Sequence, residues 1–176
     1  MKRTIEITSI NHANDLLERI DVSATEAKAK ISELLKCENA HEFMYSMKFY
    51  ETGRDPLEDR DLNIIEQLNQ QFTYITSLVA VKLLFKDYPE LSPFTVNLGT
   101  ASGFDIESNN GVLKSEVFSS ANPRNNNKLR KDVKRLFESD GEIKIVFYHA
   151  PTQHSGEEKL MKEYPGVEIK YLEKIV

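Results

Sequence analysis

The sequence has little cysteine and no long apolar run. Cys37 is the only cysteine among the 176 residues, so no disulfide can form within the chain. No apolar stretch reaches the length of a membrane span or of a signal-peptide core, since the N-terminal MKRTIEITSIN turns polar at once. We therefore expect a cytoplasmic protein with no membrane partner.

Motifs for zinc and for nucleotide phosphates are also missing. The sequence contains no HxH, HExxH or CxxC spacing, which excludes the common zinc-site patterns. The 7 glycines are scattered, and the segment Thr100-Ala-Ser-Gly103 lacks the spacing of a phosphate-binding loop. No internal repeat or low-complexity tract is visible. Any chemistry must therefore rest on carboxylates and basic side chains.

The composition is that of an ordinary globular protein, with 40% hydrophobic and 29% charged residues. We expect a single domain over residues 1–176, with a mainly helical part over 1–56 and a core over 57–176. In the helical part, the sequence predicts one short strand and three helices. The strand covers 3–10, and the helices cover 14–20, 23–36 (opened by the capping-box pattern Ser23-Ala-Thr-Glu26) and 41–50.

The core combines helical and extended patterns. A long helix over 61–86 carries a near-continuous apolar stripe. Apolar runs bounded by turn residues predict strands, and the run over 141–148 is hydrophobic enough to be covered on both faces. The fold class expected is α/β (α+β), a mixed central sheet flanked by helices. The remaining elements predicted are strands at 94–99 and 167–172, a hairpin around 109–111, and a helix over 128–138.

Two acids lie on either side of the hairpin turn Asn109-Asn110-Gly111, whose residues tolerate the positive φ of a tight turn. Alternation along the second strand places Lys114 and Glu116 on one face. Asp105 joins them if a two-residue loop closes the hairpin at Asn109-Asn110 or at Asn110-Gly111. Two adjacent carboxylates need a cation between them, either a divalent metal such as Mg²⁺ or Mn²⁺ or a buried Lys or Arg.

This region resembles the PD-(D/E)xK, or restriction-endonuclease-like, nuclease superfamily. The matching residues are Asp105 and Glu116-Val117-Phe118, within an α-β-β-α-β order that covers about half the chain. The resemblance implies a nuclease-like core over 57–176, in which Asp105 and Glu116 bind Mg²⁺ or Mn²⁺. It also implies a lysine that positions the attacking water, and Phe118 stands in that lysine's place.

The resemblance admits a displaced lysine. Lys114 shares a face with Glu116, and Lys128 or Lys131 can reach in from the following helix. Glu66, on the long helix before the hairpin, is the acid that would complete the metal site. The alternative is that Phe118 packs in the core while Lys114 forms a cross-strand salt bridge with Asp105 or Glu107.

The helix after the hairpin is strongly basic in a chain whose net charge is −5. Its cations outnumber a single acid, Asp132, and Lys128, Lys131 and Arg135 share one stripe. Basic side chains supply sequence-independent affinity for nucleic acid phosphates, although such residues also form ordinary solvated helix faces. The residues expected to contact nucleic acid are Arg124, Lys128, Lys131, Lys134 and Arg135.

Three interpretations stay open. The first is a Mg²⁺-dependent endonuclease in which Asp105 and Glu116 bind the metal, Lys114 or Lys131 replaces the missing lysine, and DNA is the expected substrate. The second is a nuclease-like fold without catalysis that binds nucleic acid or protein, with a homodimer as one assembly open to it. The third is an accessory protein unrelated to nucleases, in which Lys114 merely bridges the acids.

Overall fold

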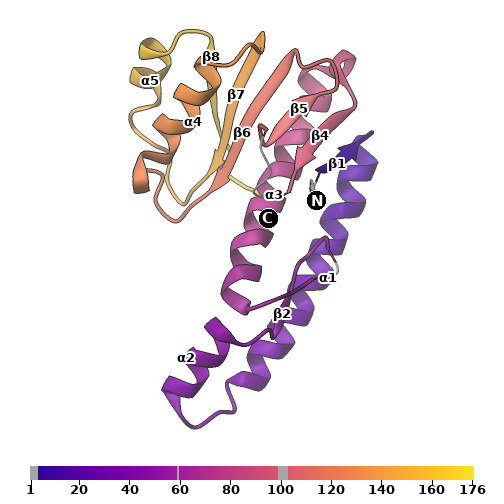
Figure 1. Cartoon of the computed structure of the whole chain (residues 1–176), viewed down its shortest axis with the longest axis vertical. Helices are drawn as coiled ribbons and strands as arrows, with labels where there is room; N and C mark the ends of the chain where they lie inside the picture. Colours follow the sequence, from indigo (N-terminus) through magenta and orange to yellow (C-terminus); the bar gives the residue numbers. More distant parts are fainter. Residues whose placement is uncertain (1–3, 59, 99–102) are drawn as a thin grey trace. The chain divides into compact units, whose positions relative to one another are not determined.

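The computed structural model of the chain describes residues 4–58, 60–98 and 103–176 (Figure 1). These residues fold as two compact units, one over Asn14–Ile75 and the other over Met1–Ala13 together with Thr76–Val176. The elements are β1 (Thr4–Ile7), α1 (Ile10–Leu34), α2 (Ala40–Phe49), β2 (Gly53–Arg54), β3 (Asp61–Leu62), α3 (Ile64–Asp87), β4 (Phe94–Asn97), β5 (Ile106–Ser108), β6 (Leu113–Ser119), α4 (Lys128–Phe137), β7 (Ile143–His149), α5 (Glu157–Glu163) and β8 (Val167–Tyr171).

The unit over Asn14–Ile75 is mainly helical. α1 runs without a break through 21–23, so the prediction of two separate helices at 14–20 and 23–36 is wrong. No glycine or proline interrupts this stretch, and Ser23 is buried inside the helix. Its hydroxyl accepts a hydrogen bond from Gln67 Nε2 at 2.9 Å instead of capping a helix. The capping-box pattern was therefore a misleading local signal.

The predicted helix at 41–50 is confirmed as α2. Asn39 caps it, because its side-chain oxygen accepts hydrogen bonds from the backbone N–H groups of His41 and Glu42. The segment after it contains a two-residue strand, β2, which pairs antiparallel with β3. None of the helices in the described ranges has the length and apolar character needed to cross a membrane.

The second unit is built on a six-stranded sheet in the order β1-β4-β5-β6-β7-β8. β1, β4, β5 and β6 pair antiparallel, whereas β6, β7 and β8 pair parallel. The predicted mixed sheet flanked by helices is confirmed. The strands expected at 94–99, 141–148 and 167–172 appear as β4, β7 and β8, and residue 99 lies outside the described residues. α5 was not predicted, because seven residues give too short a helical pattern.

Helices α4 and α5 cover one face of this sheet (Figure 1). Leu129, Val133 and Leu136 of α4 and Leu160 of α5 are buried against it. The part of α3 from Thr76 onward belongs to the same unit, and Phe85 there contacts the ring of Phe94 edge to face at 5.1 Å. Because α4 covers this face of the sheet, side chains of β6 that face α4 are buried between the sheet and the helix.

Candidate functional site

The hairpin register places Asp105 opposite Glu116. Glu107 pairs with Lys114 and Ile106 with Ser115, so the next position along brings Asp105 to Glu116. This is the register that a loop at Asn110-Gly111 requires, and Gly111 has a φ of 72°. Asp105 Oδ2 accepts the N–H of Val117 at 2.7 Å, which fixes the carboxylate beside the second strand.

Glu116 is almost completely buried, at 1% exposure, and its cationic partner is Arg135 of α4. Arg135 Nη1 donates to Glu116 Oε1 at 2.5 Å, while Nη2 donates to the carbonyl oxygen of Gly103. The guanidinium also lies 4.7 Å from the ring centroid of Phe104. An arginine, one of the cations expected at the acid pair, thus contacts Glu116.

Burial and like charge act together on the acid pair. Burial is the largest cause that raises the pKa of Glu116, followed by the neighbouring Asp105 carboxylate, and the result is about 8. Arg135 opposes this shift, and Asp132 adds to it. Burial and the neighbouring carboxylate therefore favour the protonated form of Glu116, whereas Arg135 favours the ionised form.

Asp132 is the site residue that the sequence analysis missed. It is 4% exposed, and burial raises its pKa to about 6 although Lys128 and Arg135 lower it. Lys128 Nζ donates to its Oδ1 at 2.7 Å, whereas its Oδ2 is buried without a hydrogen-bond partner. Helical spacing gave a signal, because Asp132 falls three residues after Leu129 and four before Leu136, on the apolar face of α4.

Phe118 lies in the hydrophobic core, in the position that the family motif gives to lysine. Its ring stacks on that of Tyr148 with centroids 5.4 Å apart and an interplanar angle of 17°. Lys128 Nζ lies 5.9 Å from the centroid of Phe118. The cation nearest to the motif's lysine position thus comes from α4.

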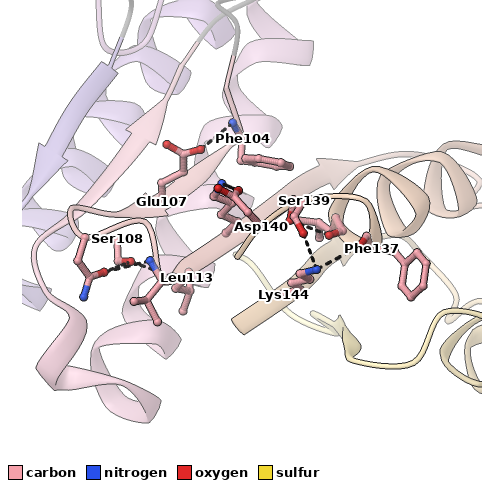
Figure 2. A network of polar contacts seen from close by, with 12 residues as sticks. Phe104, Glu107, Ser108, Leu113, Phe137, Ser139, Asp140 and Lys144 are labelled. Carbon is pink, nitrogen blue, oxygen red and sulfur yellow. Dashed lines mark hydrogen bonds and ion pairs between the residues drawn. The ribbon is translucent and has the colours of Figure 1, made fainter. Parts of the chain in front are cut away.

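Lys114 does not bridge the hairpin acids. Its ammonium forms an ion pair with Asp140, in the loop after α4, and lies 5.2 Å from the ring centroid of Phe104. Asp140 is therefore its partner, where the sequence suggested Asp105 or Glu107. Figure 2 shows the neighbouring contacts, in which Glu107 accepts the N–H of Phe104 and Lys144 donates to the carbonyl oxygens of Phe137 and Ser139.

Most cations of the basic helix have acidic partners. Besides Lys128 and Arg135, Arg130 pairs with Glu163 and Lys134 pairs with Glu138 at 3.6 Å. Arg124 donates to Ser155 Oγ at 3.1 Å. Lys131 is exposed and makes no ion pair with the described residues. The net positive charge on this face of α4 is thus smaller than the sequence alone indicates.

Glu66 belongs to a different compact unit from this cluster. It is exposed in the first turn of α3, in the unit over Asn14–Ile75, and its N–H donates to Asn63 Oδ1 at 2.8 Å. Asp105 and Glu116 belong to the other unit. Within the described ranges, no three His, Cys, Asp or Glu side chains form a group able to hold an ion.

The site thus consists of Asp105, Glu116 and Asp132 with Lys128 and Arg135 as counter-charges. A buried cluster of this kind is expensive for the fold and is typical of functional sites. No protein-family model, no curated protein and no solved structure matches this chain.

Proposed function

We propose that the chain is a metal-dependent phosphodiester hydrolase acting on nucleic acid, of the PD-(D/E)xK type. The observation that carries the proposal is the pairing of Asp105 with Glu116. Burial and the like charge of Asp105 together raise the pKa of Glu116 to about 8. Holding the buried Glu116 beside the partly buried Asp105 opposes folding, so a ligand that stabilises the arrangement is expected. A divalent cation bound between them would do so.

The residues present fit Mg²⁺ or Mn²⁺. Mg²⁺ in proteins commonly keeps several waters and uses only one or two carboxylates together with substrate phosphate oxygens, so Asp105 and Glu116 suffice. The side chain of Arg135 is 48% exposed, which leaves it free to release Glu116 when a metal binds. When bound, the ion would polarise the phosphodiester and lower the pKa of an attacking water.

The chain order around the pair also supports the proposal. Helix α3 precedes three antiparallel strands, β4, β5 and β6, and α4 then leads to β7, which is parallel to β6. With β4 as one additional strand between α3 and the hairpin, this follows the α-β-β-α-β order on which the family resemblance rests. The two acids lie at the middle of it: Glu116 is in β6, and Asp105 immediately precedes the adjacent strand β5.

We assign Lys128 the place of the displaced lysine. Lys114 is held by Asp140 and Lys131 is directed to solvent, whereas Lys128 lies over Phe118 in the motif's lysine position. Asp132 holds the Lys128 ammonium through its Oδ1, which keeps the charge at the acid cluster. In this role Lys128 stabilises the negative charge that develops on the phosphate oxygens.

Titration calorimetry with Mn²⁺ tests the metal site. The wild type is expected to bind Mn²⁺ at the hairpin, and Glu116→Gln should bind at least about tenfold more weakly because one of two anionic ligands is lost. Asp140→Asn, which removes an exposed carboxylate next to the hairpin, is the control and should bind as the wild type does. Equal Mn²⁺ affinity of all three proteins would mean that the acid pair does not bind the metal.

A second function is favoured by a different observation. Phe118 fills the lysine position and Arg135 already contacts Glu116, which is the arrangement expected of a nuclease-like fold that binds nucleic acid without cutting it. In that case the exposed cations of α4 would contact the phosphates, and no metal would be needed.

The salt dependence of binding tests this second function. Lys131→Ala combined with Lys134→Ala should weaken the affinity for single-stranded DNA, and it should reduce the slope of log K against log salt by about 1 to 2. The matched control is Lys28→Ala with Lys30→Ala, which removes the same charge from exposed positions of α1. An unchanged slope in the α4 variant would exclude these lysines from the binding surface.

A further inference from the structure

A cationic pocket lies apart from the acid cluster, between the start of α4 and the segment that leads into α5. Its volume is about 290 Å³. The charged side chains that line it are Arg124, Arg130 and Lys159, and no Asp or Glu takes part in the lining. In a chain with a net charge of −5, three cations around one cavity without an acid select for an anionic ligand.

The two guanidinium groups are held in position from outside the cavity. Arg124 Nη2 donates to Ser155 Oγ at 3.1 Å. Arg130 pairs with Glu163, which does not line the pocket. Each contact uses part of a five-donor guanidinium, so further N–H groups of both arginines can donate to a ligand. Arginine in this form suits the bidentate recognition of phosphate.

His154 adds a neutral donor to the lining. Its Nδ1 accepts the N–H of Gly156 at 2.9 Å, so in this tautomer the ring proton is on Nε2. The backbone N–H of His154 donates to the hydroxyl of Tyr148, a fully buried residue, at 2.7 Å. The loop is therefore anchored to the core, and its donors are oriented before a ligand arrives.

The remaining wall is apolar and includes Pro123, Leu129 and Leu160. The cavity is larger than an inorganic phosphate requires, and its apolar side fits a sugar or base carried by the phosphate. We infer that this pocket binds the terminal phosphate of a nucleotide, either free or at the end of a nucleic acid strand. The inference does not depend on metal binding or cleavage at Asp105 and Glu116.

Two pairs of probes test the inference by titration calorimetry at low salt. One pair is adenosine monophosphate against adenosine, and the other is a single-stranded oligonucleotide with a 5′ phosphate against the same strand with a 5′ hydroxyl. The phosphorylated member of at least one pair is expected to bind about tenfold or more tightly. Preference in the first pair identifies a free nucleotide and preference in the second identifies a strand end, and either supports the inference.

The preference should disappear in Arg124→Ala with Lys159→Ala and persist in Lys28→Ala with Lys30→Ala, which removes two exposed cations of α1 that do not line the pocket. Gly156→Ala is a second variant that removes no charge: a Cβ there would lie 2.7 Å from His154 Cε1 and displace the ring, so the preference should weaken. Asp105→Asn should keep it, which separates this test from that of the nuclease proposal. Equal binding of phosphorylated and unphosphorylated probes by the wild type, or a preference unchanged in the Arg124 and Lys159 double variant, would overturn the inference.

Discussion

Asp105→Asn is expected to reduce Mg²⁺-dependent cleavage of nucleic acid by at least about 1000-fold, because several kcal/mol of transition-state stabilisation depend on the metal and each 1.4 kcal/mol is a factor of ten. The amide oxygen can still accept the N–H of Val117, so the hairpin should keep its register. Cleavage is measured on plasmid DNA and on single strands, and folding is checked by circular dichroism and thermal unfolding.

Two further variants make this result specific. Asp140→Asn removes an exposed acid next to the same hairpin and should cleave as the wild type does. Lys128→Met should still bind Mn²⁺ and yet cleave much more slowly, since in our proposal it stabilises charge and does not bind the metal. Full activity in Asp105→Asn would exclude the acid pair from catalysis and favour the nucleic-acid-binding function.

The sequence was sufficient to predict the core of the fold because the signals there are local and agree with one another. Alternation along the second hairpin strand and the turn residues Asn109-Asn110-Gly111 anticipated the hairpin and left two registers open, of which the structure has the one that brings Asp105 to Glu116. The apolar run after α4 anticipated β7, which is buried from Ile145 to Tyr148. In both places propensity, pattern and turn chemistry point to the same structure.

The partners of the acids could not be predicted in the same way, because they depend on how α4 sits on the sheet. Arg135 and Lys131 are both basic residues of one helix, but only Arg135 reaches a buried carboxylate. Likewise, Lys114 shares a strand face with Glu116 and still turns to Asp140. The reach of a long side chain selects its partner in three dimensions, and sequence spacing alone does not specify that choice.

Asp132 shows a second limit of prediction from the sequence. One acid among six cations reads as an incidental charge, and only the apolar neighbours at helical spacing indicate that it is buried. Its burial matters because Asp132 holds Lys128 close to Phe118 and adds to the raised pKa of Glu116. Counting charge over a segment therefore missed the residue that links the basic helix to the acid pair.

The buried acid pair should make the stability of the protein depend on pH above neutrality. Burial and Asp105 raise the pKa of Glu116 from 4.5 to about 8, so the folded state binds a proton more tightly than the unfolded state. The stabilisation from that proton is complete below pH 4.5 and is lost as pH rises toward 8. Between pH 6.5 and 8 the free energy of unfolding of the wild type should fall by about 1 to 2 kcal/mol from this group, because the slope of 1.36 kcal/mol per pH unit flattens as the pH reaches the folded-state pKa.

Urea unfolding of wild type and Glu116→Gln at pH 6.5, 7.5 and 8.5 measures this loss. The variant cannot titrate at position 116, so the difference between the two curves isolates Glu116 from groups common to both, including Asp132, which titrates around pH 6. We expect the free energy of unfolding of the variant to change little with pH, so that its stability rises relative to the wild type as pH rises.

Arg135→Met should destabilise the wild type by about 3 kcal/mol at pH 8.5, where Glu116 is charged, and far less in the Glu116→Gln background. Parallel pH profiles for wild type and Glu116→Gln would mean that the proton is not held at Glu116 and that Arg135 keeps this carboxylate ionised throughout.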